Sequence, residues 1–249
     1  MIFLQASSSR AGVRQFPFLN RLARHPMLRL GLASALPLLA PSAQAAGGHH
    51  AVDDASILEP GQCQVEIWQE RTEHGAGTLN HVGPGCRWGA LEWGLNVDQV
   101  RQTGQGRQTF AGPQAKWATA LTDQWSVGFS VGANWTTRDV RYSGSTMVIP
   151  VTWQPTATLA VHGNLGLDQQ PGVGAQARRG LAAEWTPSAH WSFIAERFDD
   201  HDARHWRGGV RYLVNERVSL DLSRAAYLGA ESRPWWTFGV NWVFSPGAR

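Results

Sequence analysis

Apolar and polar residues alternate along most of the chain after Gly61, with the period of two that is typical of β-strands. The clearest segment runs from Trp125 to Trp135, where Trp, Val, Phe and Ala occupy one face and Ser, Gly and Asn the other. Residues 235–244 repeat the pattern with Trp and Phe on one face. No sustained helical period occurs in this part of the sequence. The pattern therefore predicts an all-β protein.

Twelve segments with this alternation can be marked. Most have about 9–11 residues, the length that a tilted strand needs to cross a bilayer. The weakest is 145–153, because Pro150 cannot donate a hydrogen bond to a neighbouring strand. The segments are 62–70, 79–87, 90–99, 114–122, 125–137, 145–153, 156–165, 178–186, 191–198, 205–213, 217–225 and 235–244.

The connections between these segments alternate in length. Even-numbered segments are followed by short connections, such as Asp123-Gln124 and Gln154-Pro155, and odd-numbered segments by longer ones, such as 100–113 and 166–177. Outer-membrane barrels likewise pair short periplasmic turns with long extracellular loops. Closure leaves no unpaired strand edge, which a membrane requires. We expect a closed antiparallel up-and-down transmembrane β-barrel of about twelve strands over residues 62–244.

The two faces of the predicted strands differ in chemistry. One face is wide, aromatic and almost free of charge; its exceptions, Arg179 and Arg197, lie near strand ends, where they can reach lipid headgroups. Many of the 13 tryptophans also lie near strand ends, as in interfacial girdles. The other face is small and charged, which predicts lipid outside and a polar lumen inside. The candidate lumen-lining residues are Glu92, Lys116, Glu184, Glu196, Arg207, Arg211 and Asp221.

Two arrangements of these charges are compatible with the sequence. In an open channel, arginines that oppose carboxylates across the lumen focus a transverse field and select solutes. In a packed lumen the same residues form a salt-bridge network. Small residues on the charged face leave space, which slightly favours the open lumen. They include Gly94, Ala118, Gly128, Ser130, Gly132 and Gly209.

The two cysteines give an independent check on the first hairpin. If the chain turns between His74 and Gly75, the numbers of opposed residues sum to 149, and Cys63 and Cys86 satisfy that sum. Residues that face each other across an antiparallel pair are close enough for a disulfide. The sequence therefore predicts a cross-strand disulfide, with two unrelated thiols as the alternative.

Residues 1–45 have the features of an export signal. Arg29 precedes an apolar stretch, residues 30–40, and Ala43-Gln44-Ala45 matches a cleavage site for a signal peptidase. Met27 is a candidate for the true start, and the mature chain would begin with a periplasmic segment, 46–61. The formal net charge of +3 does not indicate nucleic-acid binding, because Arg10, Arg14, Arg21, Arg24 and Arg29 all lie in this removed region.

The last predicted strand resembles the C-terminal signal that the outer-membrane assembly machinery recognises. That signal has a glycine followed by alternating aromatic residues and a final Phe, and Gly239, Trp242 and Phe244 fit it. The departure is the short tail, 245–249, which follows the final aromatic residue. The resemblance implies that the assembly machinery is a partner.

The start of the mature chain resembles a family of outer-membrane proteins associated with meta-pathway phenol degradation. Members open with a His and an Asp-Asp pair, then a Gly and a Gln-x-Glu that enter the first strand. The match here is His49-His50-Ala51-Val52-Asp53-Asp54-Ala55, followed by Gly61, Gln64 and Glu66. The resemblance implies a barrel linked to the uptake of aromatic or other small organic compounds.

Two groups of residues suggest other chemistry. His49, His50, Asp53 and Asp54 are suitable metal ligands, but packing into or under the periplasmic mouth is the favoured interpretation. His190 and Ser192 have the His-x-Ser spacing of membrane-embedded hydrolases, since a period of two places both on one strand face. No acidic partner is evident in the sequence, so we predict no enzyme and no cofactor.

The sequence thus predicts a passive channel for small organic solutes, aromatic ones among them, with lipid as its other partner. The alternative is a structural or surface-interaction barrel with a packed lumen.

Overall fold

The computed structural model describes residues 49–104, 106–200, 203–229 and 234–247. The predicted signal peptide, 1–45, with the alternative start at Met27, lies outside the described residues, as do the last two residues of the C-terminal tail. Within the described residues, no helix is long and apolar enough to cross a membrane.

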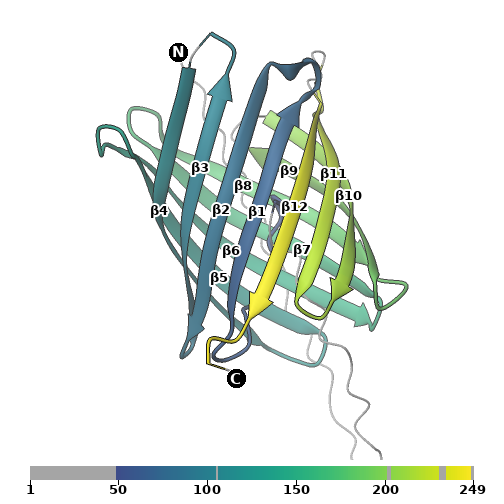
Figure 1. Cartoon of the computed structure of the whole chain (residues 1–249). Coiled ribbons are helices and arrows are strands. Elements are labelled where there is room, and N and C mark those ends of the chain that lie inside the picture. The colour runs from purple at the N-terminus through teal and green to yellow at the C-terminus, as the bar shows by residue number, and fades with distance from the viewer. Residues whose placement is uncertain (1–48, 105, 201–202, 230–233, 248–249) are drawn as a thin grey trace, which may run out of the picture. The chain divides into compact units, whose positions relative to one another are not determined.

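Twelve antiparallel strands form a closed barrel, which confirms the predicted fold class (Figure 1). Each strand pairs with its neighbours in sequence, and β1 pairs with β12 to close the sheet. A short 3-10 turn, η1 (Glu73–Gly75), joins the first two strands. The strands are β1 (Cys63–Thr72), β2 (Gly77–Trp88), β3 (Leu91–Gln102), β4 (Gly106–Ala120), β5 (Trp125–Thr136), β6 (Tyr142–Thr156), β7 (Leu159–Gln170), β8 (Gly174–Trp185), β9 (Trp191–Asp200), β10 (Ala203–Asn215), β11 (Val218–Tyr227) and β12 (Trp235–Phe244).

The long connections expected after the odd-numbered strands are largely strand extensions, and here the expectation was wrong. β3 and β4 continue through most of the predicted connection 100–113, and Arg101 pairs with Arg107 close to the turn. β7 and β8 do the same through 166–177. The extensions carry polar residues on both faces, so they lack the alternation that marks a strand in the sequence. Their backbone groups are nevertheless satisfied by pairing with the neighbouring strand.

Strand β6 also departs from the prediction. It continues past the expected turn at Gln154-Pro155 and ends at Thr156, and its pairing with β7 is irregular between Trp153 and Thr156. Pro155 lies within that irregularity, where its missing N–H breaks no regular ladder bond. Pro150 is fully buried and lies opposite Asn164 of β7.

The barrel is apolar outside and polar inside. Large apolar side chains are exposed on its outer face, where a monomeric soluble protein rarely shows so wide a patch. The buried side chains of the wall are mostly polar or charged. This inverted distribution suits a barrel with lipid around it. Examples from the outer face are Ile67, Trp93, Phe129, Ile149, Leu165, Leu181, Phe193, Leu222, Phe238 and Trp242.

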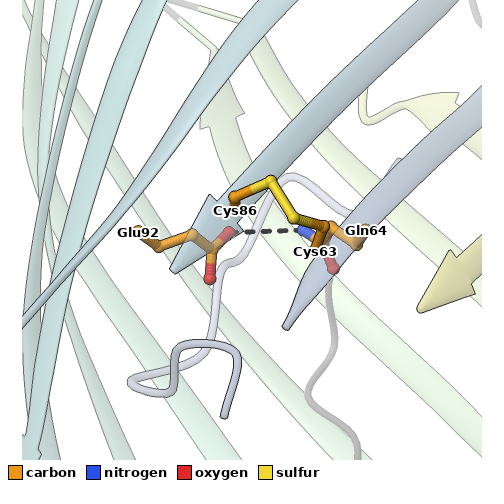
Figure 2. The surroundings of a disulfide bond; sticks show 4 residues. All are labelled: Cys63, Gln64, Cys86 and Glu92. Atoms are coloured by element: carbon orange, nitrogen blue, oxygen red, sulfur yellow. Dashed lines mark hydrogen bonds between the residues drawn. A yellow bond between two sulfur atoms is a disulfide. The ribbon is translucent and has the colours of Figure 1, made fainter. Parts of the chain in front are cut away.

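A disulfide joins Cys63 of β1 to Cys86 of β2 (Figure 2). The register pairs the two residues directly, as the sum of their numbers predicts. Cys63 shares a strand face with the exposed Ile67, so the bond lies on the outer side of the wall. It fastens the first hairpin at the end of the barrel where β12 finishes, which is the lower end in Figure 1.

We expect the double variant Cys63→Ser/Cys86→Ser to unfold more easily than the native chain. A cross-link over a sequence separation of 23 residues lowers the conformational entropy of the unfolded chain and so stabilises the fold by about 2–4 kcal/mol. The measurement is the urea midpoint of unfolding in detergent. A reductant should lower the native midpoint to that of the variant and leave the variant unchanged. Equal midpoints without reductant would contradict the stabilising role.

Candidate functional site in the barrel lumen

Residues 49–58, which we call the strap, lie inside the barrel. Val52 is fully buried and Ala55 nearly so. Side chains of β2, β3, β4, β6, β9 and β10 bond to the strap. Acceptors on the inner wall replace water for the backbone N–H groups of Ala51, Val52, Ala55 and Leu58. The assignment of 46–61 to a periplasmic segment stays a prediction.

Glu196 of β9 holds one part of the strap. Its carboxylate accepts hydrogen bonds from the backbone N–H groups of Val52 at 2.9 Å and Ala51 at 3.3 Å. Nδ1 of His50 lies 3.6 Å from the same carboxylate. A carboxylate that binds two backbone N–H groups satisfies donors that the lumen would otherwise leave unpaired.

Arg207 of β10 links Glu196 to the first described residue of the strap. Its guanidinium donates to the backbone carbonyl of His49. It also lies 3.3 Å from Glu196 and 3.0 Å from Glu70 of β1. With a side chain only 4% exposed, Arg207 needs these carboxylates to compensate its buried charge.

Lys116 of β4 binds the acidic pair of the strap. Its ammonium lies 2.7 Å from Asp53 and 3.1 Å from Asp54. Burial raises the pKa of the Asp53 carboxyl, although the nearby ammonium acts in the opposite direction. In the amide orientation that satisfies both of its groups, Asn164 of β7 also donates to the backbone carbonyl of Asp53 at 2.8 Å and accepts from its N–H at 2.6 Å.

The remaining anchors lie on β2, β3 and β6. Thr152 accepts a hydrogen bond from the N–H of Ala55, and Glu92 accepts one from the N–H of Leu58, each at 2.9 Å. Arg87 donates to the carbonyl of Leu58 at 2.8 Å. Together with the contacts on β9 and β10, these bonds carry the strap across the lumen from one side of the wall to the other.

The strap passes close to three glycines of the wall, and at Gly180 the absence of a side chain makes room for it. A Cβ atom at Gly180 would lie 2.5 Å from Val52, and one at Gly239 would lie 3.4 Å from His49. At Gly209 the nearest strap atom, on His50, would be 3.5 Å away. The space at Gly209 was taken from the sequence as favouring an open lumen, but in the structure the atoms nearest to an added Cβ belong to the wall, on Ser223 at 2.9 Å and Leu222 at 3.2 Å.

All seven residues predicted to line the lumen lie on the inner face. Four of them, Glu92, Lys116, Glu196 and Arg207, contact the strap directly. The other three form pairs along the wall: Arg211 with Asp221 at 2.7 Å, and Glu184 with His162 at 3.5 Å.

Sequence reasoning missed several strap contacts. Arg87, Thr152 and Asn164 share the inner face with the charged residues, so alternation places them in the lumen. Their partners depend on the path of the strap, which has no periodic pattern to predict it.

The other candidate chemistry finds little geometric support. Among residues 49–104, 106–200, 203–229 and 234–247, no three His, Cys, Asp or Glu side chains form a group that could hold a metal. His190 and Ser192 do not share a face as expected, because His190 precedes β9. Its exposed ring packs near Tyr212 of the outer wall, whereas buried Ser192 pairs with Thr186.

The chain belongs to the family described as "Uncharacterised conserved protein UCP029691", whose model matches residues 34–244. The resemblance of the N-terminal residues to the phenol-degradation family stays a prediction. No curated protein matches the chain by sequence.

Solved outer-membrane barrels share the fold at low sequence identity. The structure titled "KdgM porin" superposes with a TM-score of 0.59 at 8% identity, covering 73% of this chain and 99% of that one. The NanC porin gives 0.56 at 10% identity over 72% and 98%. The COG4313 outer membrane channel from Pseudomonas putida F1 gives 0.53 at 10% identity over 77% and 98%. The chain is therefore similar in fold to outer-membrane barrels.

We predict that acid releases the strap. Burial holds the pKa of His49 well below its usual value, and His50, Arg207 and Arg211 add positive charge around it. A released His49 would regain its ordinary pKa of about 6.5. The released strap therefore binds protons more readily at His49, and the contribution of His49 to docking is complete above about pH 6.5 and is lost as the pH falls below it. Asp53, whose pKa is raised in the docked strap, acts in the opposite direction at lower pH.

The labelling rate of an Ala55→Cys variant with a water-soluble thiol reagent measures this release. The rate is divided by that of an exposed Ala157→Cys variant, which removes the pH dependence of the thiol itself. This ratio should rise by about tenfold when the pH is lowered from 7.5 to 5.5. Adding His49→Gln should flatten the profile. A flat profile with His49 present would contradict the prediction.

Proposed function

We propose that the protein is a passive channel for small organic solutes in the outer membrane of a Gram-negative bacterium, with the strap as its closing element. The apolar outer face and the similarity of the fold to outer-membrane barrels support the location. The features of an export signal in residues 1–45 and the terminal residues Gly239, Trp242 and Phe244 support export and assembly by the usual machinery.

The path of the strap is the observation that carries the proposal. Contacts of the wall such as the Arg211–Asp221 ion pair and the approach of His162 to Glu184 join neighbouring strands and follow the wall. The strap contacts, by contrast, cross the lumen, and they are hydrogen bonds and ion pairs between groups that water can also satisfy. Release of the strap would leave a lumen lined by both signs of charge, which suits a solute pathway.

Aromatic side chains in the upper part of the lumen support aromatic solutes as one substrate class. The rings of Phe198 and His205 stack with centroids 5.1 Å apart, and Trp235 meets His205 edge-on at 5.4 Å. The guanidinium of Arg207 lies 5.5 Å from the Phe198 centroid and 5.9 Å from that of Trp235. Ring faces beside a guanidinium suit aromatic solutes, particularly aromatic carboxylates.

The alternative function is a structural or surface-interaction barrel with a permanently packed lumen. The full burial of Val52 and the pairing of Lys116 with both strap aspartates favour it. The two functions differ in whether the strap ever leaves its anchors.

Planar-bilayer recordings of the full mature chain separate these functions. We expect Lys116→Gln/Glu196→Gln, which removes strap anchors, to raise the open probability at least tenfold over the native protein, since each buried anchor contributes about 1–3 kcal/mol. A locked variant, Ala55→Cys/Thr152→Cys, should stay closed until reductant is added. Native protein with reductant is its control, because Cys63–Cys86 is reduced as well.

A silent Lys116→Gln/Glu196→Gln variant would reject the channel, provided that the barrel is folded and that a cysteine added at Ala55 of the same variant reacts with thiol reagents. That outcome would leave the packed barrel as the function.

The aromatic preference is tested with anions in the same recordings. Benzoate should reduce the current of the anchor-loosened variant more than acetate at equal concentration, because it can stack on the lumen rings. Trp235→Ala should remove most of that difference. Equal block by the two anions would reject aromatic carboxylates as a preferred class.

A further inference from the structure

Arginines on the outer face of the barrel gather near its upper end, opposite the end where β12 finishes. Each lies in the upper half of its strand and on the same strand face as exposed apolar residues, for example Arg71 with Ile67 and Arg179 with Leu181. They occupy β1, β3, β4 and the consecutive strands β8 to β11, whereas β5, β6 and β7 contain no arginine or lysine. We call these residues the outer arginine belt: Arg71, Arg101, Arg107, Arg179, Arg197, Arg204 and Arg224.

A groove of ≈ 570 Å³ lies on the outer wall at one side of this belt. Arg71, Glu73, Leu222, Trp236 and Phe238 are among its lining residues. It therefore has charged groups at its upper rim and an apolar floor below them.

A second groove, of ≈ 460 Å³, continues down the same part of the wall. It shares Phe238 with the first groove, and its outward lining includes Ile67, Val82, Leu220 and Val240. The two grooves together form one continuous apolar groove on the outer wall along β12, and arginines lie at one of its ends only.

Trp236 places the rim at the depth of lipid headgroups. The register sets it opposite Arg71 on one side and Arg224 on the other. The Arg224 guanidinium lies 5.8 Å from the Trp236 ring centroid, and Glu73 fixes it through bonds of 2.9 and 3.0 Å. Tryptophan collects at the membrane interface, so the guanidinium groups beside it lie where lipid phosphates lie.

We propose that these two grooves bind one phosphate-bearing, multiply acylated lipid of the outer leaflet. Its phosphate meets Arg71 and Arg224, and its acyl chains follow the floor past Leu222, Phe238 and Val240. Guanidinium binds phosphate through paired N–H donors and is favoured over ammonium for that purpose. At the rim two arginines face one carboxylate, so a positive charge remains for the lipid. The inference depends on the membrane location and not on transport.

Native mass spectrometry of the full mature chain in detergent tests the proposal. The probes are a diphosphorylated, multiply acylated glucosamine lipid, the same lipid without phosphates, and inorganic phosphate. We expect one diphosphorylated lipid per barrel, bound at least about tenfold more tightly than its dephosphorylated form, which corresponds to about 1.4 kcal/mol. Inorganic phosphate alone should not bind or compete at equal concentration.

Variants then place the site. Arg71→Gln/Arg224→Gln should lose the preference for the phosphorylated lipid, and Arg71→Lys/Arg224→Lys should recover part of it. Arg101→Gln/Arg107→Gln is the matched control, because these two outward arginines lie at the same end of the barrel but on β3 and β4, away from β12 and its grooves. It should bind as the native chain does. Folding is checked by the heat-dependent shift in electrophoretic mobility.

Three results would overturn the proposal: equal binding of the two lipids, equal loss in both pairs of Gln variants, or displacement of the lipid by inorganic phosphate. The first two would indicate unspecific acyl contact or a general charge effect, and the third a plain anion site. Because no current is measured, these outcomes are independent of whether the barrel conducts.

Discussion

The carboxylate of Glu196 is the interaction on which the contents of the lumen depend. It receives two backbone N–H groups of the strap, and it lies within ion-pair distance of Arg207, which in turn binds the carbonyl of His49. Removing it would leave the N–H groups of Ala51 and Val52 without their acceptor and would leave Arg207 with Glu70 alone among its carboxylates, which costs several times the net contribution of one hydrogen bond. The barrel can close without this group, but the strap would lose its attachment to β9.

The fold itself depends on a different constraint, the pairing of every strand edge. β1 pairs with β12 along its whole length, so the sheet has no free edge to expose to lipid. In a soluble protein, buried apolar side chains stabilise the interior. In this barrel the large apolar side chains lie on the outer face instead. The interior is left to polar groups, which are stable only if they pair with one another or with the strap. The strap therefore supplies partners that the wall cannot provide for itself.

The strand pattern was predictable because alternation is a local property. All twelve segments are strands, and the pairing of Cys63 with Cys86 follows from the position of a single turn. The strand extensions around Arg101 and Arg107 were missed, since they carry polar residues on both faces and so lack the alternation that marks a strand. The position of the strap was also missed. Its contacts with Thr152 and Asn164 join residues far apart in sequence, and no short-range signal encodes them.

The function depends on whether the strap stays permanently docked in the lumen or can be released from its anchors on the wall. Its polar contacts hold it in place at neutral pH, and each of them can be replaced by water. Amide hydrogen exchange of Ala51, Val52, Ala55 and Leu58, measured on the full chain in a bilayer, tests this most directly. The account predicts slower exchange than in an unstructured peptide, faster exchange than in the strand amides, and acceleration of Ala51 and Val52 by Glu196→Gln. Exchange as slow as in the strands would show a fixed filling, and exchange as fast as in a free peptide would show that the strap does not occupy the lumen.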